Sequence, residues 1–377
     1  RDTAIQLGRR IREYEIPAYI VRSDDQAILR DIFNRINSAG KSLDGSDVFD
    51  ALNGSRLQSR PATITQISSE LEKLDFGRIE ERLLHRLLRV LLGLPVVESA
   101  RSDPPRLTDK EAEQAYRLTA ATASQIIQFL KSDAGIPHYD LLPYKQAFVT
   151  LGRFFQLHPQ PSPRSRELLA RWIWRGALNG AHQGDTVSTR KVLARILPES
   201  EERSVNGMLE MVSGKPSAIP DVADRFNFRF AASKLLALAL FSLEPRDLVT
   251  GDRLTAGQLM SQVQSGHDSS PLLQIFPVRA GKAEEALQSA ANRLIQPPHQ
   301  RGVRRLLVGI DDSRLLLSHG ISAAVRRALD DGDSAAFLKL RAEWMRPLVE
   351  LFFARHARWD EPDRPRIASL IVDDEEG

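Results

Sequence analysis

Helical periodicity extends through most of this sequence and determines the class of fold that it can adopt. Residues 24–36 place isoleucines four positions apart, which aligns them on one face of an α-helix. Apolar residues recur at helical spacing in 78–94, 109–132, 143–159, 162–181, 187–197 and 225–243. Thr108, with Glu111 three residues later, has the pattern of a capping box at the start of one long helix. These features predict a mainly α-helical protein.

Composition and charge restrict the functions that are open to the chain. Its 377 residues are enough for two or three domains, and its 42% of apolar residues can fill real cores. A net charge of +3 with a pI near 9.2 allows a nucleic-acid partner without requiring one. The absence of cysteine excludes disulfides and thiolate zinc sites, and it is consistent with a cytoplasmic protein.

Two further features concern membranes and the start of the chain. The longest apolar run covers 235–241, far short of the roughly 20 residues that a membrane helix needs. We therefore expect no membrane partner. The chain opens at Arg1 without a methionine, and we expect it to be a fragment of a longer protein.

The hexapeptide NSAGKS (37–42) ends in Gly-Lys-Ser, as nucleotide-binding P-loops do. A P-loop follows a buried strand, and its first glycine would fall at position 35, which is Arg35. The preceding residues 24–36 have the periodicity of a helix instead. We therefore predict a tight loop between two helices, with Gly40 in the loop and no Walker A site.

The second of these helices is predicted to begin close to the loop. Ser42 or Asp44 can cap it, and Asp47 lies in its first turn. Its expected apolar face consists of Val48, Phe49 and Leu52.

The longer stretch 31–52, DIFNRINSAGKSLDGSDVFDAL, resembles a segment of a known family. The pattern F-x-R-[IL]-N-x-G-G-x-x-L is typical of the DGQQR-type domain of GmrSD-type modification-dependent restriction and phage-defence proteins. The matching residues are Phe33, Arg35, Asn37, Gly40 and Leu43. Ala39 departs from the pattern, because the family usually has two adjacent glycines there. Residues 13–21, EYEIPAYIV, resemble the strand that precedes the helix in this family.

The resemblance implies a partial α/β segment with a ParB/sulfiredoxin-like fold, which binds and hydrolyses a nucleotide in the complete domain. On that reading the nucleotide contacts would be Arg35, Asn37, Gly40 and Lys41. Helix-end capping and loop bracing are the alternative roles for Arg35 and Asn37. The name-giving D-G-Q-Q-R motif is absent and would lie before residue 1. A nucleoside triphosphate and a divalent metal are therefore expected for complete family members, and no cofactor is expected in this chain.

The segment RWIWR (171–175) interleaves basic and aromatic residues, as nucleic-acid surfaces do. The resulting candidates for DNA contacts are Arg164, Arg171 and Arg175. A structural role is the alternative, because Trp172 and Trp174 point about 200° apart on a helix, so at least one of them would lie in the core. The same family often carries an R-W-[FI]-W helix in its all-α region, without an assigned catalytic role.

The C-terminal third resembles the HNH nuclease end of this family, which has a strand H-H-I-F-P followed by N-x-x-x-N-R. Residues 271–277, PLLQIFP, match the I-F-P end, whereas Leu273 and Gln274 occupy the two histidine positions. Asn292, in the stretch SAANRLIQPP, falls at the usual asparagine. Residues 315–344 resemble the helical closing section.

One-metal HNH chemistry needs a histidine as general base and further groups that hold a divalent metal. Leucine binds no metal, and glutamine cannot take a proton from water near pH 7. We therefore predict a degenerate centre without catalytic residues or metal, in which the strand still forms and Ile275 and Phe276 lie in the core. A relocated histidine is the alternative, and the histidines nearest in sequence are His267, His299 and His319.

These features predict three parts: the end of a ParB-like domain over 1–55, an all-helical domain over 56–215 and a degenerate α+β HNH-like domain over 216–377. The predicted function is a component of a prokaryotic DNA-restriction or anti-phage defence system that binds or senses DNA, with nucleotide coupling from a missing N-terminal part. Partner defence proteins are also expected. The alternatives are a non-catalytic protein-interaction scaffold and an active HNH nuclease.

Overall fold

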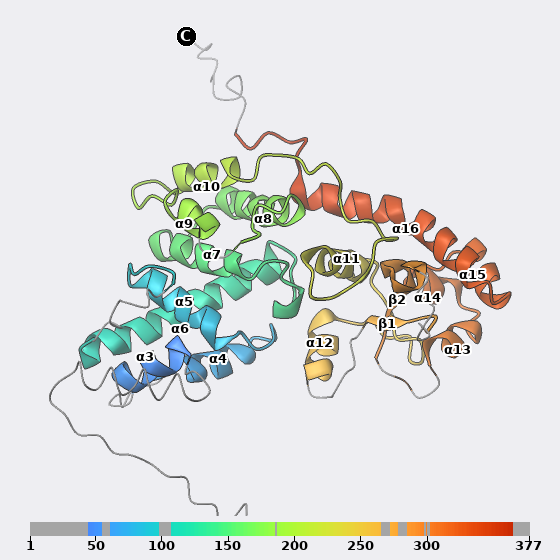
Figure 1. Cartoon of the computed structure of the whole chain (residues 1–377), viewed down its shortest axis with the longest axis horizontal. Coiled ribbons are helices and arrows are strands. Elements are labelled where there is room, and N and C mark those ends of the chain that lie inside the picture. Colours follow the sequence, from blue (N-terminus) through green and yellow to red (C-terminus); the bar gives the residue numbers. More distant parts are fainter. Residues whose placement is uncertain are drawn as a thin grey trace, which may run out of the picture.

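The structure is a computed structural model that describes residues 44–54, 61–97, 107–184, 187–264, 272–277, 285–297, 299 and 302–364. Within these residues the protein is mainly α-helical, with one two-stranded sheet (Figure 1), which confirms the predicted helical class. The expected loop at Gly40, the strand at 13–21 and the nucleotide contacts Arg35, Asn37 and Lys41 lie outside the described residues. None of the helices described is long and apolar enough to cross a membrane.

The first helices of the described chain pack on one another through largely apolar faces. They are α3 (Gly45–Asn53), α4 (Ile64–Glu72), α5 (Glu81–Leu91), α6 (Asp109–Ser132) and α7 (Gln146–Leu157). The capping box predicted for α6 is confirmed. The Glu111 carboxylate accepts a hydrogen bond from the Thr108 N–H at 2.8 Å, and the Thr108 hydroxyl accepts one from the Glu111 N–H at 3.3 Å.

Helix α3 begins as predicted but turns a different face to the core. Asp44 caps it, and the Asp47 carboxylate accepts a hydrogen bond from the Asp44 N–H at 3.2 Å. Phe49 is buried as expected, whereas Leu52 is 42% exposed, so its predicted place in the apolar face is wrong. Asn53 is buried one turn after Phe49. Its side-chain oxygen accepts a hydrogen bond from the N–H of Leu107, the residue before the Thr108 cap of α6, at 2.9 Å.

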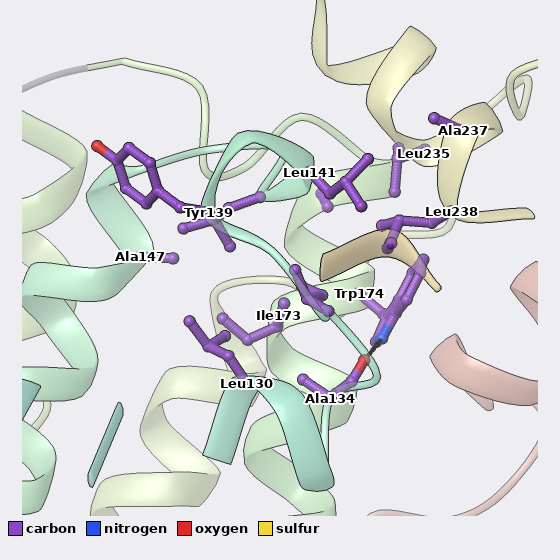
Figure 2. Close-up of a cluster of buried hydrophobic side chains, with 14 of the residues drawn as sticks. Leu130, Ala134, Tyr139, Leu141, Ala147, Ile173, Trp174, Leu235, Ala237 and Leu238 are labelled. Atoms are coloured by element: carbon purple, nitrogen blue, oxygen red, sulfur yellow. Dashed lines mark hydrogen bonds between the residues drawn. The ribbon is translucent and has the colours of Figure 1, made fainter. Parts of the chain in front are cut away.

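The next helices are α8 (Pro163–Leu178), α9 (Val187–Leu193), α10 (Glu201–Glu210) and α11 (Ala231–Phe241). Helix α8 is covered on several sides, because α10, α11 and the last helix of the chain all contact it. Trp172 and Trp174 are therefore both buried, although they leave the helix in different directions. Figure 2 shows Trp174 in the core, where its Nε1–H donates to the Ala134 carbonyl oxygen at 2.8 Å.

The C-terminal half combines the small sheet with four short helices and the long helix α16. Its elements are α12 (Ala256–Gln264), β1 (Leu272–Gln274), β2 (Arg293–Ile295), α13 (Val303–Val308), α14 (Ser313–Leu317), α15 (Ala323–Asp330) and α16 (Ser334–Ala357). Helix α16 runs from α15 to α8 and contacts both (Figure 1). One hydrophobic cluster includes residues from Phe49 to Ala357. The buried core therefore continues past residue 215, where the sequence predicted a domain boundary.

Arg341 fixes the position of α16 against the sheet. Only 1% of it is exposed, and its guanidinium donates to three backbone carbonyls. Nη2 lies 2.7 Å from the His319 oxygen, Nη1 lies 2.8 Å from the Arg293 oxygen, and Nη1 also donates to the Ala291 oxygen. Burial lowers the pKa of Arg341 to about 9, so the group remains charged at neutral pH. One side chain thus joins α16, the start of β2 and the segment after α14.

We predict that Arg341→Met destabilises the fold strongly. The variant leaves the buried carbonyls of Ala291, Arg293 and His319 without this donor, and each orphaned acceptor costs about 1–3 kcal/mol. The total loss in the free energy of unfolding should exceed about 3 kcal/mol, measured from urea denaturation. Lys339→Ala, an exposed change on the same helix, is the control. A midpoint for Arg341→Met equal to that of the control would contradict this role.

Candidate functional site

The hairpin formed by β1 and β2 lies where the sequence predicted the HNH-like strand. The two strands are antiparallel, with Leu273 opposite Leu294 and Gln274 opposite Arg293. Ile275 and Phe276 follow directly and are buried. The predicted short strand and its packing into the core are therefore confirmed.

Asn292 clamps the end of this hairpin. It is completely buried, and its side-chain oxygen accepts a hydrogen bond from the Phe276 N–H at 2.8 Å. Its amide nitrogen donates to the carbonyl oxygens of Phe276 at 2.8 Å and Leu287 at 2.7 Å. Both ends of the buried amide are thus bonded to backbone groups, so Asn292 ties the residues after β1 to those before β2.

The side chains at the two histidine positions add no suitable chemistry. Leu273 and Gln274 are both half-buried and, as neighbours in a strand, point to opposite faces. A hydrocarbon, a neutral amide and a committed asparagine do not fit a catalytic divalent metal. In the part of the chain that the structure describes, no group of three His, Asp or Glu side chains could hold a metal ion.

The histidines considered as replacements have other surroundings or are not described. His319 is buried, its Nε2 lies 2.6 Å from the Arg246 carbonyl oxygen, and burial lowers its pKa to about 4. His319 is therefore neutral at pH 7 and is held by the backbone. His299 forms an interaction within the chain, and His267 lies outside the described residues.

Helix α13 carries basic side chains close to the hairpin. The guanidinium carbon of Arg304 is 5.0 Å from the centre of the Phe276 ring, in a cation–π arrangement, and Arg304 and Arg305 are both exposed. Arg326 from α15 caps the end of α13, donating to the Val308 carbonyl at 2.8 Å. The adjacent arginines after Gly302 are the sequence signal for this cluster, and they lie outside the motifs that were predicted to carry function.

The three arginines predicted to contact DNA have very different environments. Arg171 and Arg175 are only 2% and 3% exposed, and they form ion pairs with Asp363. Arg164 remains on the surface, where it pairs with Glu167 at 2.7 Å. In this structure Arg171 and Arg175 therefore bind groups of their own chain, and they are not available as surface contacts.

Asp50 on α3 is a titratable group that belongs to none of the predicted motifs. Its carboxylate accepts hydrogen bonds from the Tyr116 hydroxyl at 2.8 Å and the Ile64 N–H at 2.9 Å. Burial, helped by the negative charges of Asp47 and Glu81, raises the pKa of Asp50 to about 6, and the two hydrogen bonds oppose this rise. The group therefore changes its charge near neutral pH.

We predict that Asn292→Asp destabilises the hairpin without creating a metal site. The aspartate keeps an oxygen that can accept from the Phe276 N–H. Its second oxygen replaces the amide nitrogen and faces the carbonyl oxygens of Phe276 and Leu287. Urea denaturation at pH 7.5 should show a loss of about 2–4 kcal/mol, from two lost bonds with unsatisfied acceptors. If Asn292 were a metal ligand, the aspartate would bind Mg²⁺ or Mn²⁺ more tightly, and added metal would restore the stability.

We predict a distinct pH dependence for Asp50→Asn. The ordinary pKa of 3.8 is raised to about 6 in the fold, so the folded state holds the proton more tightly than the unfolded chain. This contribution to stability is complete below about pH 4 and is lost as the pH rises through 6. The variant lacks this loss, so its stability relative to the wild type should increase between pH 4 and 6. Tyr116→Phe removes a hydrogen bond that lowers this pKa and should move the change to higher pH. Parallel stability curves for the wild type and Asp50→Asn would contradict the assignment.

Comparison with known proteins adds no relative from which a function could be transferred. No family model matches the chain, and neither the curated proteins nor the solved structures include a match. The likeness to GmrSD-type proteins therefore depends on the motifs quoted above.

Proposed function

We propose that this chain is a component of a cytoplasmic, prokaryotic DNA-restriction or anti-phage defence system, and that it binds DNA without cutting it. The observation that carries the proposal is the hairpin with its Asn292 clamp beside exposed arginines on α13. The Asn292 clamp supports a structural role for the hairpin, because the hydrogen bonds of the amide all go to backbone groups. The arginines supply the charge that phosphate contacts require.

Arg304 and Arg305 are the best-placed contacts for the DNA backbone. Both are exposed on α13, and the aromatic ring of Phe276 holds the Arg304 guanidinium close to the hairpin. Arginine binds phosphate oxygens through two parallel hydrogen bonds. Contacts of this kind carry no base recognition, so the binding should tolerate changes of sequence.

Nucleotide coupling belongs to the same proposal but depends on the complete protein. The residues that would contact the nucleotide are Arg35, Asn37, Gly40 and Lys41. They precede α3, whose cap at Asp44 and buried Phe49 attach that end of the chain to α5. A nucleotide bound before α3 would thus act on the helical core through this helix.

A protein-interaction scaffold is the second candidate. Leu348 and Leu351 lie three residues apart on α16 and are 37% and 47% exposed. Exposed leucines on one helical face favour a protein partner, and a partner defence protein would fit this role. Such a complex would depend little on salt, whereas phosphate binding weakens steeply as salt rises.

Fluorescence anisotropy with a labelled DNA duplex tests the proposal. We predict that wild-type protein binds at about 50 mM salt and loses affinity steeply toward 200 mM. Arg304→Glu/Arg305→Glu should weaken binding and lower the log–log salt slope by about 1.8, at about 0.9 per phosphate contact. Lys73→Glu/Lys110→Glu changes the net charge equally at exposed sites on α4 and α6, and it is the matched control.

Two results would contradict the proposed function. Absence of binding at low salt would remove DNA as a partner. Nicking of supercoiled plasmid with Mg²⁺ or Mn²⁺, abolished by Asn292→Ala in a protein that is still folded, would show an active nuclease.

A further inference from the structure

A short segment after α16 lies across the arginine face of α8. Arg358 has a left-handed backbone conformation with φ of 46° and turns the chain at the end of α16. Residues 358–364, which we call the strap, then contact α8 through ion pairs and hydrogen bonds. Arg164, Arg171 and Arg175 are seven and four residues apart, so all three lie on one face of α8 beneath the strap.

The strap presents carboxylates and carbonyls to these arginines. Asp363 bridges two of them, since its carboxylate oxygens accept from Arg171 Nη1 at 3.1 Å and from Arg175 Nη1. Glu361 accepts from Arg171 Nη2. Arg164 Nη2 donates to the Asp363 carbonyl oxygen at 3.1 Å. Two guanidinium groups around one small anion are an arrangement that also suits a phosphate group.

Arg171 and Arg175 are buried where the strap contacts α8, whereas the strap itself remains accessible. The side chain of Glu361 is 52% exposed and that of Asp363 27% exposed, whereas Arg171 and Arg175 are almost fully covered. The Nε–H of Arg171 is buried without a hydrogen-bond partner among the described atoms. The site thus has more donors than the strap satisfies. Glu361 is exposed and Asp363 is half-buried, so both carboxylates can be reached from solvent and an added polyanion can compete with them for the arginines.

We propose that the face of α8 formed by Arg164, Arg171 and Arg175 is a second phosphate-binding site, and that the strap occupies it in the absence of DNA. This inference rests on the proposed DNA binding. When DNA displaces the strap, every arginine stays paired, because phosphates of the DNA backbone replace the Glu361 and Asp363 carboxylates. Since the strap is part of the chain, its effective concentration is high and it lowers the affinity for DNA. The strap is therefore autoinhibitory.

Full-length Glu361→Gln/Asp363→Asn tests the inference with almost no change in shape. Measured by anisotropy with the same duplex, this variant should bind about 10-fold more tightly than wild type, because the tethered competitor loses its charge. Its log–log salt slope should become steeper by up to about 2.7, for three further phosphate contacts. Adding the exposed change Arg164→Gln should remove about one third of this increase.

Glu343→Gln/Glu350→Gln removes the same charge from exposed positions on α16 and should leave affinity unchanged. An equal gain in this control would overturn the inference, because the effect would then be one of net charge. If wild type binds DNA and Glu361→Gln/Asp363→Asn binds with the same affinity, the autoinhibitory role of the strap is overturned while the proposed function stays intact. Absence of binding by every variant at low salt would overturn both.

Discussion

The buried guanidinium of Arg341 is the interaction on which the C-terminal half depends. Removing a charged group from water costs several kcal/mol, and it is offset here by carbonyl oxygens from two separate segments. Those carbonyls belong to the start of β2 and to the turn after α14, so both are held against α16. The far end of the same helix offers the Ala357 carbonyl to Arg175 on α8 at 2.7 Å. One helix therefore positions the hairpin at one site and the strap at another.

The sequence was sufficient to predict the helical class and several local signals, whereas α4 and α10 were not predicted. The capping box at Thr108, the cap at Asp44 and the strand before Ile275 follow from short-range chemistry and are confirmed. Burial was harder to predict, because it depends on neighbours that are distant in sequence. Leu52 is exposed although it fits the helical pattern, and Trp172 and Trp174 are both buried because α8 is covered on several sides.

At the candidate site, too, local features could be predicted from the sequence and long-range contacts could not. The sequence identified Asn292 but not its role, because the hydrogen bonds to Phe276 and Leu287 appear only once the hairpin closes. It identified Arg171 and Arg175 as basic, but their partner Asp363 lies 192 and 188 residues away in the chain. No pattern in the sequence connects such distant charges. The structure therefore has an exposed arginine site on α13 beside the hairpin, and a second arginine site on α8, near the other end of α16, that the chain itself covers.

Hydrogen–deuterium exchange with and without a short DNA duplex tests the central claim, that DNA binds at the hairpin and displaces the strap. At low salt and saturating duplex, amides of 272–277 and 303–308 should exchange more slowly, because the DNA covers them. Amides of 358–364 should exchange faster in the same sample, because the strap leaves α8. Slower exchange in the strap, or no change in any of these segments, would contradict the account.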